Sequence, residues 1–303
     1  HAGRGGAGQG AALPLSDGTY FAAAGAPPAR GGARGFGRGG PGGGGGFGGP
    51  SVTTIVDTAY FARCAWIVSQ SATLLGKPDD AKKYDDLYHR ICDTFTKPFV
   101  QPDGSMPAGS QTTYCLALEF NLVPDALRPL ILKHLTDDID QRQHLSTGFV
   151  GVGFINLVLG QHDRSDEAYK LLLTDTYPSW LYEVKNGATT MWERWDGWTD
   201  TGGFQASSMN SFNHYSFGGV GRWMYEGMEG ITLDESHPGY KQFLLQPEFS
   251  NAITYVKGSI DSPYGKIVSN WHIDGDNLLY DVTVPPNSTA IMTLPVPAAN
   301  LKA

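Results

Sequence analysis

The stretch TIVDTAYFARCAWIVSQSATLLG, residues 54–76, decides the fold class, because it carries only two charges over about six helical turns. Apolar and small side chains recur in it at helical spacing in two stripes: Ile55, Ala59, Ala62, Trp66 and Ser69, and Val56, Tyr60, Cys64 and Ile67. Thr54 and Asp57 form a near capping box, and Gly76 is expected to end the helix. A helix that is apolar on two sides has to be covered on two sides.

The next stretch, residues 79–97, has the opposite character. Its sequence DDAKKYDDLYHRICDTFTK is crowded with charge and keeps a single apolar stripe, which predicts a surface helix. The same pairing recurs twice downstream. Segments 111–122 and 147–160 carry almost no charge, and each is followed by a charged helical segment, 125–141 and 165–174.

Buried and surface helices that alternate with a period of about 45 residues are typical of two architectures. One is a double ring of inner and outer helices, and the other is a helical-repeat solenoid. With a last helix expected at 211–229, seven helices are predicted, which are too few to close a ring of six pairs. We therefore expect either an open array or a partial (α/α)6 barrel. The chain begins with His1 rather than Met, so we expect it to be a piece of a longer protein.

After Gly230 the helical periodicity stops and short β-rich runs follow. They are residues 243–249, 253–260, 266–273, 278–284 and 289–296, separated by turn signals such as Asp274-Gly-Asp-Asn277. These five runs predict a small antiparallel β-sandwich. The predicted domains are a Gly-rich segment at 1–50, the helical part at 51–231 and the sandwich at 232–303.

Composition excludes several classes of function. Residues 1–50 hold twenty of the forty Gly, and Arg34 to Gly40 resembles the Arg-Gly segments of RNA-binding proteins; the alternative is a solvated linker. A net charge of −8 favours the linker, and we expect no nucleic-acid partner. Three Cys without a C-x-x-C pair indicate neither a disulfide framework nor a Cys metal site.

The sequence also shows no clear membrane-spanning segment. The longest uncharged stretch, residues 145–161, contains four Gly and is shorter than the roughly 18–20 apolar residues that cross a bilayer. We expect no membrane partner. No basic segment followed by an apolar core opens the chain, and the compartment and oligomeric state stay open.

The most unusual composition is TTMWERWDGW, residues 189–198, where three of the seven Trp surround Glu193, Arg194 and Asp196. Indole rings stack on the C–H faces of sugars, and carboxylates and Arg bind sugar hydroxyls. The alternative is that these Trp fill the core at the end of the helical part. Downstream, SSMNSFNHYSFGG at residues 207–219 places Asn213 and His214 at the expected start of a helix, where His214 is either a structural residue or a hydroxyl contact.

These two segments, in this order, resemble the signature of the bacterial α-L-rhamnosidases of glycoside hydrolase family 78. QTTY at 111–114, LSTGF at 145–149, YPSW at 177–180 and the terminal sandwich fit the same family. The resemblance extends from about Thr54 to the C-terminus. It implies an (α/α)6 barrel with a C-terminal β-sandwich, no metal or organic cofactor, and hydrolysis of terminal α-L-rhamnosides with inversion.

The resemblance also implies roles for particular residues. Glu193 corresponds to the general base, His214 and Asn213 to sugar contacts, and Trp192 and Trp195 to the lining of the sugar subsite. The acidic motif that carries the family's general acid has no counterpart here, so the acid is expected outside this sequence. The alternatives are another (α/α)6 glycosidase or lyase, and a non-catalytic sugar-binding remnant.

Overall fold

The structure, a computed structural model, describes residues 13–14, 20–21 and 51–295. Apart from the short antiparallel strands β1 (Leu13–Pro14) and β2 (Tyr20–Phe21), the predicted Gly-rich segment 1–50 lies outside the described residues, and so does its Arg-Gly stretch. The chain divides into two compact units. The described residues up to Arg142 form the first with Ser146–Gly151, and Gln143–Leu145 form the second with the residues from Val152 onward.

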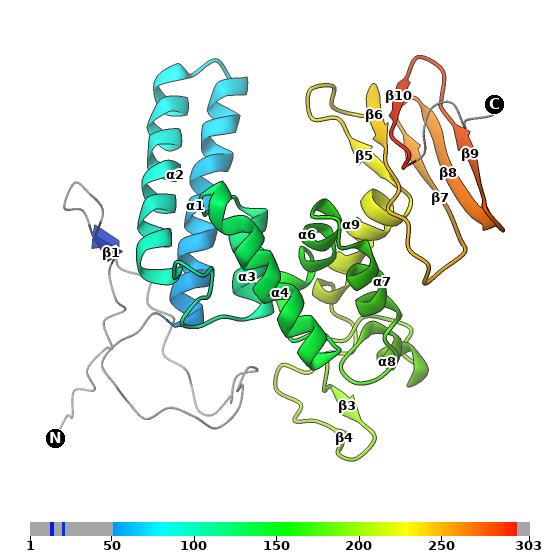
Figure 1. Ribbon diagram of the computed structural model, residues 1–303, viewed down its shortest axis with the longest axis horizontal. Helices are drawn as coiled ribbons and strands as arrows, with labels where there is room; N and C mark the ends of the chain where they lie inside the picture. The colour runs from blue at the N-terminus through cyan, green and yellow to red at the C-terminus, as the bar shows by residue number, and fades with distance from the viewer. Residues whose placement is uncertain (1–12, 15–19, 22–50, 296–303) are drawn as a thin grey trace. The chain divides into compact units, whose positions relative to one another are not determined.

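The first unit is helical. Its elements are α1 (Val52–Leu74), α2 (Pro78–Phe99), α3 (Gln111–Glu119), the 3-10 turn η1 (Asp125–Leu127) and α4 (Arg128–Arg142). Helices α1 and α2 lie side by side as a long hairpin (Figure 1). Helix α2 buries Tyr88, Ile91, Phe95 and Phe99 on one stripe, as predicted for a surface helix.

Helix α1 starts earlier than predicted. Its N-cap is Ser51, whose side chain accepts the Thr54 N–H at 3.1 Å, so the near capping box at Thr54 is not the start. Gly76 follows the helix with φ +65°, as expected of a terminating glycine. Of the two apolar stripes, the one containing Ile55 is buried, whereas Ile67 on the other is exposed in the part of the chain that the structure describes. Of the two apolar sides of α1 that were expected to be packed against other elements, one is buried in this way.

Helix α3 is the buried partner in the second pair. Ser110 and Thr113 form a complete capping box at its start. Gln111 donates to Asp138 of α4 at 3.0 Å and accepts the Ser146 N–H at 2.7 Å, and the hydroxyls of Thr112 and Thr147 lie 2.7 Å apart. The segments 111–114 and 145–149, noted separately in the sequence, thus contact each other.

In the second unit the helices are shorter than predicted. They are α6 (Ile155–Gln161), α7 (Ser165–Leu173), α8 (Trp180–Lys185), the 3-10 turn η2 (Ser216–Gly219), α9 (Val220–Trp223) and the π-helical turn η3 (Met224–Met228). The helix predicted at 147–160 is divided into α5 (Phe149–Val152), which lies across the boundary of the units, and α6. The helix predicted at 211–229 is wrong over its first five residues, and α8 was not predicted.

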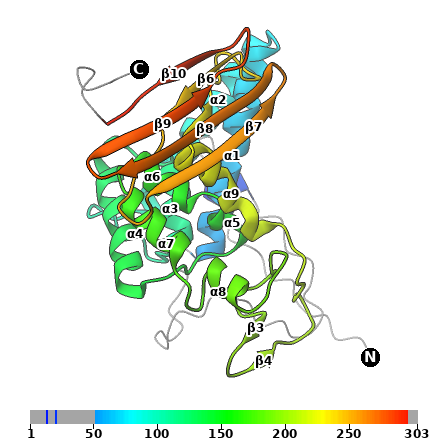
Figure 2. The same cartoon turned by 90° about the vertical axis from the view of Figure 1, so that its right-hand side faces the viewer.

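The C-terminal part of this unit contains two three-stranded sheets. The first sheet has the order β10 (Thr289–Met292), β6 (Gln242–Leu245), β5 (Ile231–Leu233) (Figure 1). The second has the order β7 (Tyr255–Ser262), β8 (Gly265–Asp274), β9 (Asn277–Thr283), and Figure 2 shows these three strands side by side. Ile231, Phe243, Leu245 and Ile267 form a buried core. Each of the five predicted runs overlaps a strand; β5 was not predicted, and β10 pairs with β6 in parallel rather than antiparallel.

Glu248 joins the helices of this unit to its sheets. Its Oε2 accepts from Trp223 Nε1 at 2.9 Å and from the Ser165 hydroxyl at 3.3 Å, while its backbone oxygen accepts from Tyr169 at 2.8 Å. Gly160 of α6 packs so closely on the carboxyl that a Cβ there would lie 2.0 Å from it. The contact between the helices and the sheets of this unit therefore depends on the Glu248 carboxyl and on Gly160, which leaves room for it.

Candidate active site

Two segments of the second unit form the candidate site, and we call residues 190–193 the first arm and residues 211–214 the second arm. The Glu193 N–H donates to the Ser211 carbonyl, and the His214 N–H donates to the Met191 carbonyl, both at 2.8 Å. The Thr190 hydroxyl donates to the Phe212 carbonyl. The second arm is therefore irregular chain hydrogen-bonded to the first arm rather than the helix N-terminus that was predicted, and helical structure begins at Ser216.

The Glu193 carboxylate is oriented by the second arm. The Ser211 N–H donates to Oε2 of Glu193 at 2.8 Å. The side chain is half-buried. This charge-assisted hydrogen bond holds one oxygen of the carboxylate in place.

The backbone beyond the second arm sets the tautomer of His214. The Ser216 N–H donates to Nδ1 of His214 at 3.2 Å, so in the neutral ring the proton resides on Nε2, which is then a donor. The imidazole stacks on the ring of Tyr215, with 5.1 Å between centroids and 12° between planes. Asn213 is exposed beside it, and its N–H donates to the Ser211 hydroxyl at 3.1 Å.

Trp192 and Trp195 are buried, at 4% and 5% exposed. Trp192 packs edge-to-face on Phe212, and Trp195 stacks on Phe217 with 3.8 Å between ring centroids. These contacts favour the interpretation that the two indoles fill the core beneath the arms. Their contact with substrate stays a prediction.

Arg194 and Asp196 bind each other next to Glu193. Arg194 Nε and Nη2 donate to the two oxygens of Asp196 at 2.9 and 3.0 Å, a bidentate pair. The chain then forms the hairpin β3 (Trp198–Thr199) and β4 (Gly203–Phe204). The Gln205 N–H closes this hairpin on the Gly197 carbonyl at 3.1 Å, and Asn210 Nδ2 donates to the same carbonyl at 3.0 Å.

Helix α8 supports these segments from beneath, through three side chains that sequence reasoning missed. Trp180 Nε1 donates to the Phe217 carbonyl at 2.8 Å, and the Tyr182 hydroxyl accepts the Asp200 N–H at 3.2 Å. Glu183 Oε2 accepts the Trp192 N–H at 3.2 Å. The Ser179 side chain caps the helix by accepting from Tyr182 N–H. Ser179 after Pro178 was the available signal, but a six-residue helix shows little periodicity.

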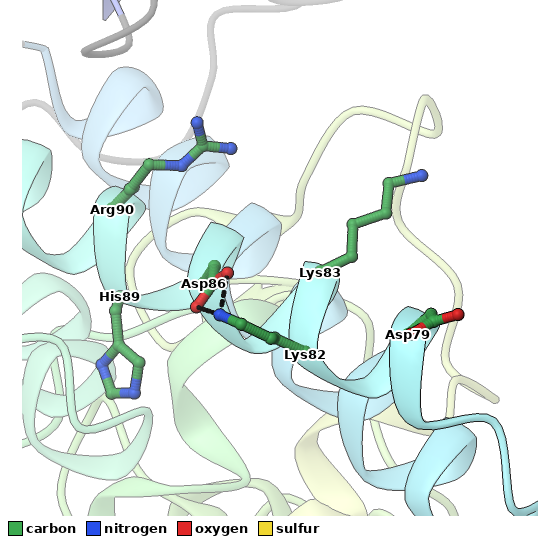
Figure 3. A pocket seen from close by; sticks show the side chains of 6 residues that line it. All are labelled: Asp79, Lys82, Lys83, Asp86, His89 and Arg90. Atoms are coloured by element: carbon green, nitrogen blue, oxygen red, sulfur yellow. Dashed lines mark hydrogen bonds and ion pairs between the residues drawn. The ribbon is translucent and has the colours of Figure 1, made fainter.

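A hollow along α2 in the first unit offers no comparable chemistry. It is lined by side chains of that one helix: Asp79, Lys82, Lys83, Asp86, His89 and Arg90 (Figure 3). Lys82 binds Asp86 at 2.7 Å in an ordinary pair one helical turn apart. Among the described residues, no group of three or more His, Cys, Asp or Glu side chains is arranged to hold a metal, and no helix is long and apolar enough to cross a bilayer.

Comparison with known proteins covers both the helical part and the sheets. Residues 45–228 match the model of the bacterial alpha-L-rhamnosidase 6 hairpin glycosidase domain, and residues 230–303 match that of the bacterial alpha-L-rhamnosidase C-terminal domain. The chain belongs to the bacterial α-L-rhamnosidase family. The helical part is accordingly a portion of a six-hairpin, or (α/α)6, barrel rather than a solenoid, and the sheets form the C-terminal domain of this family.

Individual rhamnosidases extend the comparison. An α-L-rhamnosidase of Streptomyces avermitilis is 40% identical over 242 residues, and one of Formosa agariphila is 36% identical over 250 residues. These matches cover 80% and 82% of this chain but 23% and 27% of the relatives, so the chain spans about a quarter of their length.

Solved structures of the family give the same result. The S. avermitilis α-L-rhamnosidase complexed with L-rhamnose aligns with a TM-score of 0.76, covering 80% of this chain and 23% of that one. The α-L-rhamnosidase of Aspergillus terreus aligns with a TM-score of 0.77 at 31% identity, covering 80% of this chain and 28% of that one.

Proposed function

We propose that this chain supplies the general base and part of the sugar subsite of an enzyme that hydrolyses terminal α-L-rhamnosides with inversion. The observation that carries the proposal is the Glu193 carboxylate, which the Ser211 N–H holds by one oxygen beside the arm that bears His214. Family membership supplies the substrate class.

In the proposed step, Glu193 accepts a proton from water while the water oxygen attacks the anomeric carbon of the rhamnoside. The bond to the leaving oxygen breaks, and a general acid located outside this sequence protonates that oxygen. The products are free rhamnose of inverted configuration and the released alcohol. Such a water fits between the two carboxyl groups when they lie about 6.5–9.5 Å apart.

The remaining predicted residues bind the sugar or support the arms. His214 donates from Nε2 to a sugar hydroxyl, which its Nδ1 contact with Ser216 prepares it to do. Asn213 presents its exposed amide on the same arm. Trp192 and Trp195 form the apolar floor, and their ring edges border the sugar.

The test is hydrolysis of p-nitrophenyl α-L-rhamnopyranoside by the protein expressed from its complete reading frame, with the first anomer of free rhamnose identified by NMR. We expect β-L-rhamnose to appear first. An α-anomer formed first would contradict inversion, and release from other p-nitrophenyl glycosides alone would favour a different (α/α)6 glycosidase. Binding of rhamnose without hydrolysis would identify a sugar-binding remnant.

A further inference from the structure

The second unit contains buried carboxyls that the proposed reaction does not use. Burial raises the pKa of Glu248, and it raises the pKa of Glu229 to about 7; both lie where the helices meet the sheets. Glu183 is more fully buried than either, at 1% exposed, and it contacts the first arm instead. A buried carboxyl is costly to keep unless its position serves a purpose.

The contact of Glu183 is made with the backbone of the residue before Glu193. Oε2 accepts the Trp192 N–H at 3.2 Å, and Oε1 has no hydrogen-bond partner among the described residues. Because peptide units are planar, an anchor on the Trp192 N–H fixes the 191–192 peptide, from which the chain continues through Trp192 to Glu193. The Glu193 N–H is fixed on the opposite side by the Ser211 carbonyl.

We propose that Glu183 is a positioning residue for Glu193: from α8 it holds the backbone of the first arm in the orientation that presents the Glu193 carboxylate to water. This inference rests on the proposed function, since it assigns Glu193 the role of base. In this role Glu183 needs a side chain long enough to bring an acceptor oxygen to the Trp192 N–H, and it does not need a negative charge. The neighbouring anchors of α8, Trp180 on Phe217 and Tyr182 on Asp200, support the same loop at other points.

Two substitutions, made in the protein expressed from its complete reading frame, distinguish the effect of the length of the Glu183 side chain from the effect of its charge. Glu183→Gln keeps the length and an acceptor oxygen, and Glu183→Asp keeps the charge but withdraws the carboxylate by one methylene. Glu248→Asp is the matched control, because it shortens a buried carboxyl that does not contact either arm. The probe is p-nitrophenyl α-L-rhamnopyranoside, and hydrogen exchange of peptides covering residues 190–194 is measured in parallel.

We expect Glu183→Asp to lower kcat about 100-fold while KM changes less than about threefold, as for a displaced reacting group. Glu183→Gln retains kcat within about fivefold, and Glu248→Asp within about threefold on a folded-protein basis. Exchange at 190–194 accelerates about tenfold in Glu183→Asp and stays unchanged in Glu248→Asp.

Three results would overturn the inference. They are unchanged kcat and exchange in Glu183→Asp, equal loss of kcat in Glu183→Gln, and equal loss of kcat in Glu248→Asp. Should the parent protein hydrolyse no rhamnoside, the proposed function fails. The exchange comparison then still decides whether Glu183 holds the first arm.

Discussion

Glu193→Gln preserves the shape of the side chain but removes its ability to accept a proton from water. Since the Ser211 N–H can bind an amide oxygen as it binds Oε2, the second arm is expected to stay in place. In the protein expressed from its complete reading frame, kcat for rhamnoside hydrolysis falls by about 10²–10⁴-fold and KM changes little. Steady-state kinetics with p-nitrophenyl α-L-rhamnopyranoside measure both.

The matched control is Glu235→Gln, because Glu235 is an exposed carboxyl in the same unit. It is expected to leave both kinetic constants unchanged. Turnover like that of the parent in Glu193→Gln would assign the base to another residue.

His214→Ala separates binding from chemistry. Removing the imidazole deletes the Nε2 donor and frees the Ser216 N–H, but it leaves the backbone pairing of His214 with Met191 intact. We expect KM to rise about tenfold with a smaller change in kcat, since a contact made equally in the ground and transition states acts on KM. A loss confined to kcat would show that the imidazole acts in the transition state.

Glu183 also has a consequence for stability. Burial raises its pKa from 4.5 to about 7 in the folded protein, so the unfolded chain ionises first as pH rises. Stability therefore falls between about pH 4.5 and 7, and the loss is complete above that window. Glu183→Gln cannot ionise, and its stability relative to the parent is expected to be about 2 kcal/mol greater at pH 8 than at pH 5. Thermal unfolding at the two pH values tests this; a gain that is the same at both would refute it.

At the scale of elements, the packing of α6 against Glu248 gives a further prediction. A Cβ on Gly160 would push the Glu248 carboxyl away from Trp223 and Ser165, leaving buried donors unpaired. Gly160→Ala is expected to cost about 1–3 kcal/mol of unfolding free energy.

Gly221 of α9 is the matched control for Gly160, because nothing lies within 4 Å of a Cβ added there. Gly221→Ala is expected to be neutral or to stabilise by up to about 1 kcal/mol, as alanine does in a helix. Equal destabilisation by the two substitutions, measured by denaturant unfolding, would argue against the close contact at Gly160.

Elements with a long periodic pattern were predictable from the sequence. Helices α1 and α2 begin and end within a few residues of the predicted positions, and the five predicted runs overlap β6 to β10. Their amphipathic or alternating patterns are local properties of the chain. The cap at Ser51 was missed because Thr54 offers similar chemistry three residues later.

The sequence located the segments of the candidate site but not their geometry. Composition singled out the segments that contain Glu193 and His214, and the family resemblance suggested their roles, whereas the pairing of the two arms joins segments about twenty residues apart in the sequence. Helix α8 and Glu183 escaped notice because six residues are too few to show a period. The sequence pattern from Ser211 onward predicted a helix. At residues 211–214, hydrogen bonds to the first arm override that local preference.

At the scale of the whole molecule, the 303-residue chain spans about a quarter of the length of its relatives. Under the proposed function it supplies the general base, and the general acid comes from outside this sequence. We therefore expect the isolated chain to release no p-nitrophenol from the rhamnoside, while the protein from the complete reading frame does. Turnover by the purified 303-residue chain would place both the acid and the base within it.

The closure of the β3–β4 hairpin at Gly197 and Gln205 has an evolutionary consequence. Main-chain pairing and α8 hold Glu193 and His214, but the hairpin is tied to both supports: the Asp200 N–H donates to the Tyr182 hydroxyl of α8, and Phe204 packs edge-to-face on Phe212 of the second arm. Under the proposed function, natural variation or engineering of residues 198–204 is therefore expected to spare the two arms only where these two contacts are kept.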